Sequence, residues 1–167
     1  MPPPRVENPL TNLDCSRGSQ INARMPSRSR QKKPAPFSSS SLMIVSIGID
    51  IIEVARIREV LQRTPRFRER VFTAAEQAYC DSRGVVAEQH YAARYAAKEA
   101  ALKALQTGWR GSISWHDVEI NSLESGAPVI TFSGEARRLF EASGAAKVHL
   151  SMSHTTEHAI AEVILER

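Results

Sequence analysis

Two acidic residues occupy positions at which the neighbouring sequence demands a special role for a carboxylate. Asp50 follows directly on the apolar run 43–49 and is itself followed by Ile51 and Ile52. A carboxylate among so many apolar side chains needs an opposite charge, several hydrogen-bond donors or a metal ion. Asp is also a favoured N-cap, so Asp50 either begins the helix predicted at 53–63 or binds a metal, and capping is the commoner role.

Glu99 is the second acid, and the other charged residues around it are all basic: Arg94, Lys98 and Lys103. Glu99 and Lys103 have the i,i+4 spacing of a helix-surface ion pair, which contributes about 0.3–0.5 kcal/mol. A carboxylate flanked by cations also suits Mg²⁺ and a bound anion, because Mg²⁺ is held by one or two carboxylates and by substrate phosphates. On these residues alone the two interpretations are equally open.

Arginines are concentrated between residues 56 and 70. A run of charge is usually a solvated face, but Arg binds carboxylates in a bidentate manner, and Arg and aromatic side chains are enriched in interfaces. With Phe67 expected to be exposed among them, the cluster predicts a docking surface for an acidic partner. Its basic members are Arg56, Arg58, Arg63, Arg66, Arg68 and Arg70.

Two histidines and two serines gather near the end of the chain. His149, Ser151 and Ser153 share one face of a predicted strand, and His154 follows it. This pattern weakly indicates contact with a phosphate or a ribose. A zinc site is not expected, because no third ligand stands at a useful spacing.

The elements that must position these residues follow from the spacing of apolar side chains. Thr73 and Glu76 form a capping box that opens the second helix. Strands and helices do not alternate as βαβ units, so we expect an α+β fold in which an antiparallel sheet packs against helices. Strands are predicted at 43–49, 113–120, 129–132, 147–153 and 159–165, the last of them central, and helices at 53–63, 73–83, 88–103 and 135–143.

The first 42 residues differ in composition from the rest. They hold seven of the nine prolines, eight serines, and seven Lys/Arg against two acids. Such a segment cannot bury enough apolar surface to order itself, so 1–42 is predicted to be a disordered basic extension and 43–167 the folded domain. An upstream extension is favoured over a transit peptide, because prolines and acids are unusual in the latter.

Composition excludes several classes of protein. A length of 167 residues suits one globular domain. The net charge of +4 arises from the extension and is no sign of a nucleic-acid-binding domain. Cys15 and Cys80 cannot make a disulfide scaffold, and no apolar run approaches the ~20 residues of a membrane span. A soluble cytoplasmic protein without nucleic-acid or membrane partners is expected.

Six short motifs, taken in order, resemble the 4′-phosphopantetheinyl transferase superfamily, and most closely its small bacterial holo-[acyl-carrier-protein] synthase group. The resemblance runs from Met43 to about Glu166. It departs from the family at Gln106, usually Gly, and at Ala127, often Lys; both lie in predicted loops. The motifs are Gly48-Ile49-Asp50-Ile51-Ile52-Glu53, Phe72-Thr73-Ala74-Ala75-Glu76, Arg94-Tyr95-Ala96-Ala97-Lys98-Glu99-Ala100 with Lys103, Ala104-Leu105-Gln106-Thr107-Gly108, Gly126-Ala127-Pro128 and Ser151-Met152-Ser153-His154.

The resemblance implies a specific reaction. Such enzymes require Mg²⁺, move the phosphopantetheine arm of coenzyme A to a serine of apo acyl carrier protein and release 3′,5′-ADP. They are homotrimers with active sites between subunits. By this resemblance Asp50 and Glu99 hold the metal, and Glu99 and Lys103 are catalytic, although a metal-bound water is an equal candidate for accepting the serine proton. Coenzyme A is expected at Lys98, Lys103, Gly108, Pro128 and His154, and the carrier protein at Arg56, Arg63, Arg66, Phe67 and Arg70.

Two alternatives come from other classes of protein. A metal-dependent nucleotide phosphodiesterase would need further carboxylates for a second metal, and Asp50 and Glu99 have no obvious companions in the sequence. A non-enzymatic RNA-binding protein with a basic tail would need aromatic and basic residues interleaved on a strand, which the predicted domain lacks.

Overall fold

The computed structural model describes residues 43–64, 66–107 and 112–167. The predicted extension 1–42 and Gly108 lie outside the described residues. Within them, a three-stranded antiparallel sheet has the order β1 (Ile44–Glu53), β5 (His158–Glu166), β4 (Lys147–His154). The predicted α+β class is confirmed, and so is the central position of the last strand.

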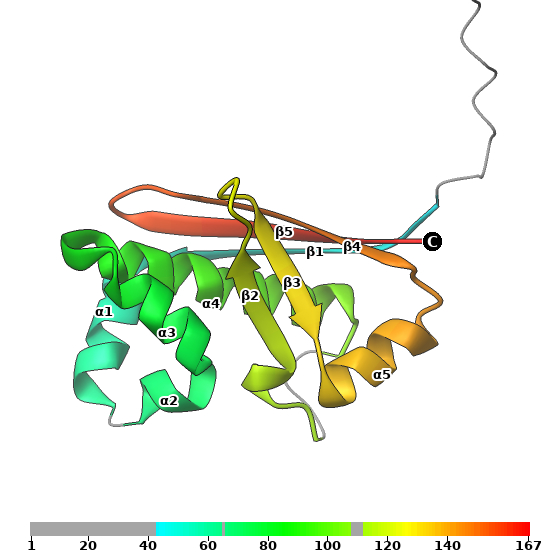
Figure 1. The fold of residues 1–167 in the computed structure, drawn as a ribbon, viewed down its shortest axis with the longest axis horizontal. Coiled ribbons are helices and arrows are strands. Elements are labelled where there is room, and N and C mark those ends of the chain that lie inside the picture. The colour runs from blue at the N-terminus through cyan, green and yellow to red at the C-terminus, as the bar shows by residue number, and fades with distance from the viewer. Residues whose placement is uncertain (1–42, 65, 108–111) are drawn as a thin grey trace, which may run out of the picture. The chain divides into compact units, whose positions relative to one another are not determined.

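Helix α4 (Ala87–Ala104) runs along one face of this sheet (Figure 1). Alternation along β1 turns Gly48, Asp50 and Ile52 toward the helix and leaves Ile47, Ile49 and Ile51 exposed. The β5 residues opposite are small or aliphatic on the helix side, and they are buried: Ala159, Ala161, Val163 and Leu165. The sheet therefore has one packed face and one open face, which is aliphatic along β1 and mixed in character along β5 and β4.

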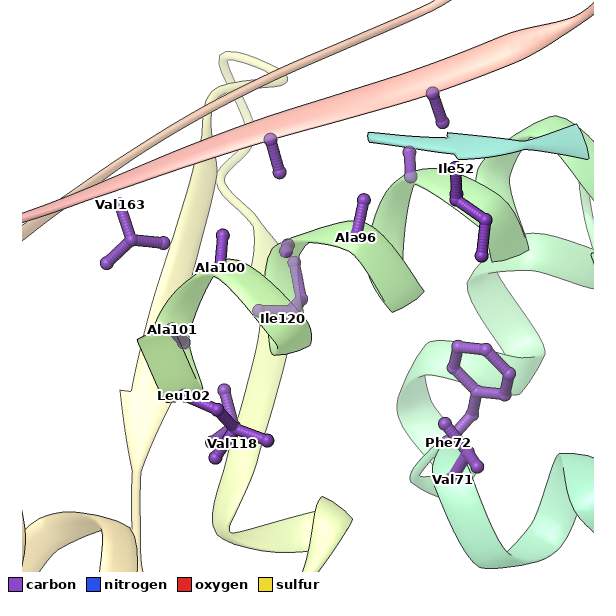
Figure 2. Close-up of a cluster of buried hydrophobic side chains, with 14 of the residues drawn as sticks. Ile52, Val71, Phe72, Ala96, Ala100, Ala101, Leu102, Val118, Ile120 and Val163 are labelled. Carbon is purple, nitrogen blue, oxygen red and sulfur yellow. The ribbon is translucent and has the colours of Figure 1, made fainter. Parts of the chain in front are cut away.

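Strand β1 and helix α4 lie so close together that their backbones are in contact. A Cβ added to Gly48 would lie 2.0 Å from the carbonyl oxygen of Ala100 and 2.6 Å from the amide nitrogen of Ala104. Ser46 also donates a hydrogen bond of 2.6 Å to the Ala104 carbonyl. Figure 2 shows the small side chains of Ala96 and Ala100 on the side of α4 that faces the strands. Glycine on the strand and alanine on the helix make this approach possible.

A second antiparallel pair joins β2 (Val118–Ser122) to β3 (Pro128–Phe132). The helices and single 3₁₀ turns are α1 (Val54–Arg63), α2 (Phe67–Val71), α3 (Ala74–Asp81), η1 (Gly84–Val86), η2 (Trp115–Asp117) and α5 (Gly134–Ala142). Helices α1 and α3 and the second sheet pack against α4, and α5 packs on the second sheet.

Several boundaries differ from those predicted. The capping box of Thr73 and Glu76 is confirmed at the start of α3. The strand expected from residue 113 begins only at Val118, because Ser114 and Asp117 cap each other and hold a 3₁₀ turn before it. The first strand continues to Glu53, since its pairing with β5 extends as far as His158. Among the described residues, no helix is long and apolar enough to cross a membrane.

Candidate active site

Asp50 lies inside β1 and is not a helix cap. The N-cap of α1 is Glu53, whose side chain makes no capping bond. Asp50 pairs through its backbone with Ala161 and turns its side chain toward α4. The capping interpretation is therefore excluded, and the carboxylate must be stabilised by groups on the helix.

Lys103 is the direct partner of Asp50. Its ammonium lies 2.7 Å from Oδ1 of Asp50 and donates to the Ile49 carbonyl at 2.9 Å. The side chain of Asp50 is 17% exposed and that of Lys103 50%. Lys103 thus bonds across to the strand instead of forming the helix-surface pair with Glu99 that the spacing suggested.

Glu99 completes the site, one helical turn before Lys103. Burial raises the pKa of Glu99, and the negative charge of Asp50 raises it further. A hydrogen bond from Tyr95 and the charges of Lys103 and Arg56 oppose this rise. Burial, followed by the charge of Glu99, raises the pKa of Tyr95 to about 12, so its hydroxyl remains a donor. The charge of Asp50 therefore acts at Glu99, as expected for the two carboxylates predicted as partners.

This arrangement fits a magnesium ion. Asp50 and Glu99 offer carboxylate oxygens, and only Lys103 balances them by a direct bond among the described side chains. The described part of the chain contains no cluster of three or more His, Cys, Asp or Glu side chains that could hold a metal. A site built on Asp50 and Glu99 would therefore use two protein carboxylates. Mg²⁺ is commonly held by one or two carboxylates, with waters and substrate phosphates completing its shell.

Lys98 corrects an expectation. It follows directly before Glu99 in the sequence, but its side chain is fully buried on another side of α4. Its ammonium lies 3.0 Å from Oε2 of Glu76 and donates to the carbonyls of Trp115 and Val118. Burial lowers the pKa of Lys98, and Glu76 opposes that change. The predicted contact with coenzyme A is wrong for Lys98, because its amine is enclosed and already bonded.

Arg94 does not flank Glu99 either. Its guanidinium lies 3.8 Å from the centre of the Tyr79 ring, and the residue is 2% exposed. Both Arg94 and Lys98 therefore belong to the buried contacts of α4 with α3 and β2 rather than to the carboxylate site.

The docking cluster is partly corrected. Phe67 is buried against Phe72 and Tyr95, with ring centres 6.2 and 6.1 Å away, because the short helix α2 turns it inward. The expectation of an exposed aromatic residue was wrong. Its four predicted arginine companions are exposed, in α1 and around α2: Arg56, Arg63, Arg66 and Arg70.

Two adjoining hollows open beside Arg56 and Arg58 of α1. One of about 310 Å³ is lined by Ile51, Ile52, Glu53, Arg56 and His158. The other, of about 420 Å³, is lined by Glu53, Ala55, Arg58, Thr156, Glu157 and His158. Both lie where β1 passes into α1, which places room for a ligand or partner near the end of the strand that carries Asp50.

The other residues predicted to bind coenzyme A lie on separate elements. His154 ends β4, two strands away from β1, and its ring centre lies 4.9 Å from that of His90. Pro128 opens β3 in the second sheet. Gly108 lies outside the described residues. These assignments stay predictions.

Two residues important to the site were missed in the sequence. Tyr95 bonds Glu99, and its i,i+4 spacing from that residue on one helix face was the available signal. Gly48 lets β1 approach α4, and its position two residues before Asp50 on the same strand face was the signal there.

The comparisons with known proteins agree with this geometry. The family model described as "4′-phosphopantetheinyl transferase superfamily" matches residues 46–162. The chain therefore belongs to this superfamily, as its motifs led us to expect. A holo-[acyl-carrier-protein] synthase of Koribacter versatilis is 47% identical over 125 residues, which cover 74% of this chain and 99% of the relative.

Solved structures show the same fold. A holo-(acyl-carrier-protein) synthase from Bacillus anthracis in complex with CoA (3′,5′-ADP) matches with a TM-score of 0.62 and 39% identity, over 74% of this chain and 97% of that one. The holo-[acyl-carrier-protein] synthase from Neisseria meningitidis matches with a TM-score of 0.67 and 32% identity, over 75% of this chain and all of that one.

Proposed function

We propose that this chain transfers the 4′-phosphopantetheine arm of coenzyme A to a serine hydroxyl of apo acyl carrier protein and releases 3′,5′-ADP. The observation that carries the proposal is the meeting of Asp50, Glu99 and Lys103, from β1 and α4, in a chain similar over almost their whole length to proteins named holo-[acyl-carrier-protein] synthase. One such relative was solved with CoA (3′,5′-ADP) bound.

The reaction needs positioned charge more than a protein nucleophile. The serine oxygen of the carrier protein forms a bond to the pantetheine-side phosphorus of coenzyme A, and the bond from that phosphorus to the bridging pyrophosphate oxygen breaks. Negative charge gathers on the leaving 3′,5′-ADP. Mg²⁺ held by Asp50 and Glu99 supplies charge neutralisation when bound. The exposed ammonium of Lys103 stabilises a phosphate oxygen of the leaving group.

Glu99 is our candidate for accepting the serine proton. In the metal-free chain, burial and the charge of Asp50 raise its pKa, the direction that favours proton acceptance. The bond from Tyr95 fixes its orientation. A water molecule in the site is the alternative acceptor, and because Glu99 is also a proposed metal ligand, the Glu99→Gln variant does not separate the two routes.

The carrier protein would dock on the exposed arginines of α1 and α2. Arg56 lines one of the two hollows at the end of β1 and Arg58 the other, and a partner with acidic side chains complements this basic surface. Arg56→Glu should raise the KM for carrier protein about tenfold and leave the KM for coenzyme A unchanged, because docking charges act mainly on encounter. Arg137→Glu reverses a charge on the remote helix α5 and is the control. An unchanged KM in the Arg56 variant would count against docking there.

The assembly is proposed to be a homotrimer. The support is the open sheet face, where Ile47, Ile49, Ile51 and Ile160 are between 38% and 64% exposed. Exposed isoleucines gathered along β1 and the neighbouring strand are costly in water and are typical of an interface. Light scattering on the wild-type chain and on Ile49→Glu tests this proposal: a wild-type protein that is monomeric at micromolar concentration contradicts it.

The catalytic unit is proposed to be residues 43–167, acting in the cytoplasm. The family match at 46–162 supports these bounds. A chain that lacks residues 1–42 should keep near-normal transfer. An inactive truncated protein would show that the first 42 residues contribute to activity.

The decisive experiment is intact-mass analysis of apo carrier protein incubated with the full chain, coenzyme A and Mg²⁺. We expect the mass of one phosphopantetheine to be added, and no addition when EDTA replaces the metal. A matched reaction without carrier protein tests the phosphodiesterase alternative, because a hydrolase would release 3′,5′-ADP there. Release without any carrier-protein modification would overturn the proposed function.

A further inference from the structure

The ion pair between Lys103 and Asp50 has features that suggest a temporary bond. The lysine ammonium lies 2.7 Å from Oδ1 of Asp50. The proposed metal would bind the same carboxylate. An ammonium bonded to a carboxylate and a metal ion on the same carboxylate compete for its lone pairs and repel each other.

The charges around the pair are unbalanced. Asp50 and Glu99 act on each other as like charges, and among the described side chains Lys103 alone is recorded in a direct ion pair with either of them. Within the described part of the chain, Arg56 contributes a positive potential at Glu99 and makes no direct bond to either acid. The two carboxylates therefore carry two negative charges, and the one ammonium in a direct ion pair with them neutralises only one.

The position of Lys103 allows it to leave. Its side chain is 50% exposed and lies in the last turn of α4, which ends at Ala104. Lysine has four rotatable methylene units, so the ammonium can turn toward solvent without movement of the helix. Its second acceptor, the carbonyl of Ile49, lies on the same strand and keeps the amine close to the site.

We propose that Lys103 is an internal counter-ion that holds Asp50 in place in the metal-free protein and is displaced from that carboxylate when a divalent cation binds. The displaced ammonium then becomes free for an anionic oxygen of the substrate. This inference rests on the proposed function for the identity of the site, but it concerns the order in which two cations use one carboxylate.

The test is direct measurement of Mn²⁺ binding to the full chain without coenzyme A or carrier protein, from the electron paramagnetic resonance signal of free Mn²⁺. Lys103→Met removes the competing cation and should tighten Mn²⁺ binding roughly tenfold, although the same variant loses transfer activity. Lys103→Gln, a polar replacement at the same exposed position, should behave in the same way and protects the test against misfolding of one variant.

Two controls separate displacement from a general loss of positive charge. Lys103→Arg keeps a cation able to bond Asp50 and should bind Mn²⁺ about as the wild type does. Arg56→Met removes a nearby charge that has no recorded bond to Asp50, and it should tighten binding less than threefold, since an exposed unbonded charge is well screened.

Unchanged or weaker Mn²⁺ binding in both neutral variants would overturn the inference, and so would equal tightening in Arg56→Met. Binding that persists in Asp50→Asn at wild-type strength would show that the cation sits elsewhere, which also overturns it. Failure of the carrier-protein assay, with tightening still observed, would instead overturn the proposed transfer reaction and leave the exchange of cations standing.

Discussion

Helix α4 carries two acid–lysine contacts of opposite character. On one side Lys98 meets Glu76, and both side chains are fully buried. On another, Lys103 meets Asp50, and half of the lysine side chain is exposed. The first contact is closed: Glu76 also accepts from the backbone amides of Thr73 and Ile120, and Lys98 also bonds two carbonyls. The second is open, with an additional carboxylate beside it.

The difference shows how neighbouring residues divide structure from chemistry. Lys98 and Glu99 are adjacent in sequence, and the helical turn of about 100° between them sends one into the interior and one to the site. A buried charge is tolerated only with complete pairing, so Lys98 has no bond left for a ligand. Among the described side chains only Lys103 forms an ion pair with Asp50 or Glu99, and this incomplete pairing favours the cation site that we propose.

The largest expected effect comes from the open contact. Glu99→Gln keeps the shape of the side chain but removes its charge, and should lower the transfer rate by at least about a thousandfold, since charge in the site is what the reaction uses. Circular dichroism should show an unchanged fold. Wild-type turnover by this variant would break the distinction between the two contacts.

Mutation of the closed contact between Lys98 and Glu76 should lower the stability of the fold. Lys98→Met leaves the Glu76 carboxylate buried without its cation and should cost about 3–5 kcal/mol of unfolding free energy, measured by urea titration. Addition of Glu76→Gln in the same chain should recover part of the loss, because the uncompensated charge is then gone. A loss below about 1 kcal/mol would mean that water reaches the Lys98–Glu76 pair and that the pair is not buried as described.

The approach of strand and helix links the two contacts. Gly48→Ala places a methyl group against the Ala100 carbonyl, so α4 must shift, at a cost of about 1–3 kcal/mol. Because the carboxylates move apart with it, the transfer rate should fall about tenfold or more. Gly126→Ala is the comparison for a glycine with open space around it, although its positive φ also adds strain. Gly48→Ala with wild-type activity would show that the spacing tolerates movement.

The smallest expected effect is a change with pH in the thermal stability that Glu99 contributes. Burial and then the Asp50 charge raise the pKa of Glu99, so the folded state binds this proton more tightly than the unfolded chain does. The stability that Glu99 contributes is therefore present at acidic pH and is lost as the pH rises from the ordinary value through the raised one. Glu99→Gln should melt about 3 °C above the wild type near pH 8, and the gap should close in acid. A gap that widens in acid contradicts the assignment.

Much of the fold could be predicted from local patterns. The long helix containing Glu99, the capping box at Thr73 and the central last strand were confirmed, because each rests on spacing within one segment. The family and its class of fold were also predictable, since the motifs occur in order over the whole domain.

Side-chain orientation around α4 could not be predicted in the same way. The helix is rich in alanine and buried over most of its circumference, so apolar spacing does not reveal which side faces the site. Lys98 was misplaced because its partner Glu76 lies 22 positions earlier in the printed sequence. Phe67 was misplaced for the same reason: its arginine neighbours in sequence suggested exposure, whereas Tyr95, distant in sequence, covers its ring.

The absence of side-chain bulk between Gly48 and Ala100 has a consequence for how this protein can vary. Where a strand and a helix are in contact through their backbone atoms, the van der Waals radii of those atoms set the distance between the two elements. Substitutions of core side chains cannot change that distance. Changes of substrate preference are then expected outside this contact, in loops and exposed side chains around the site, while the spacing of the strand and the helix that carry the two acids stays the same.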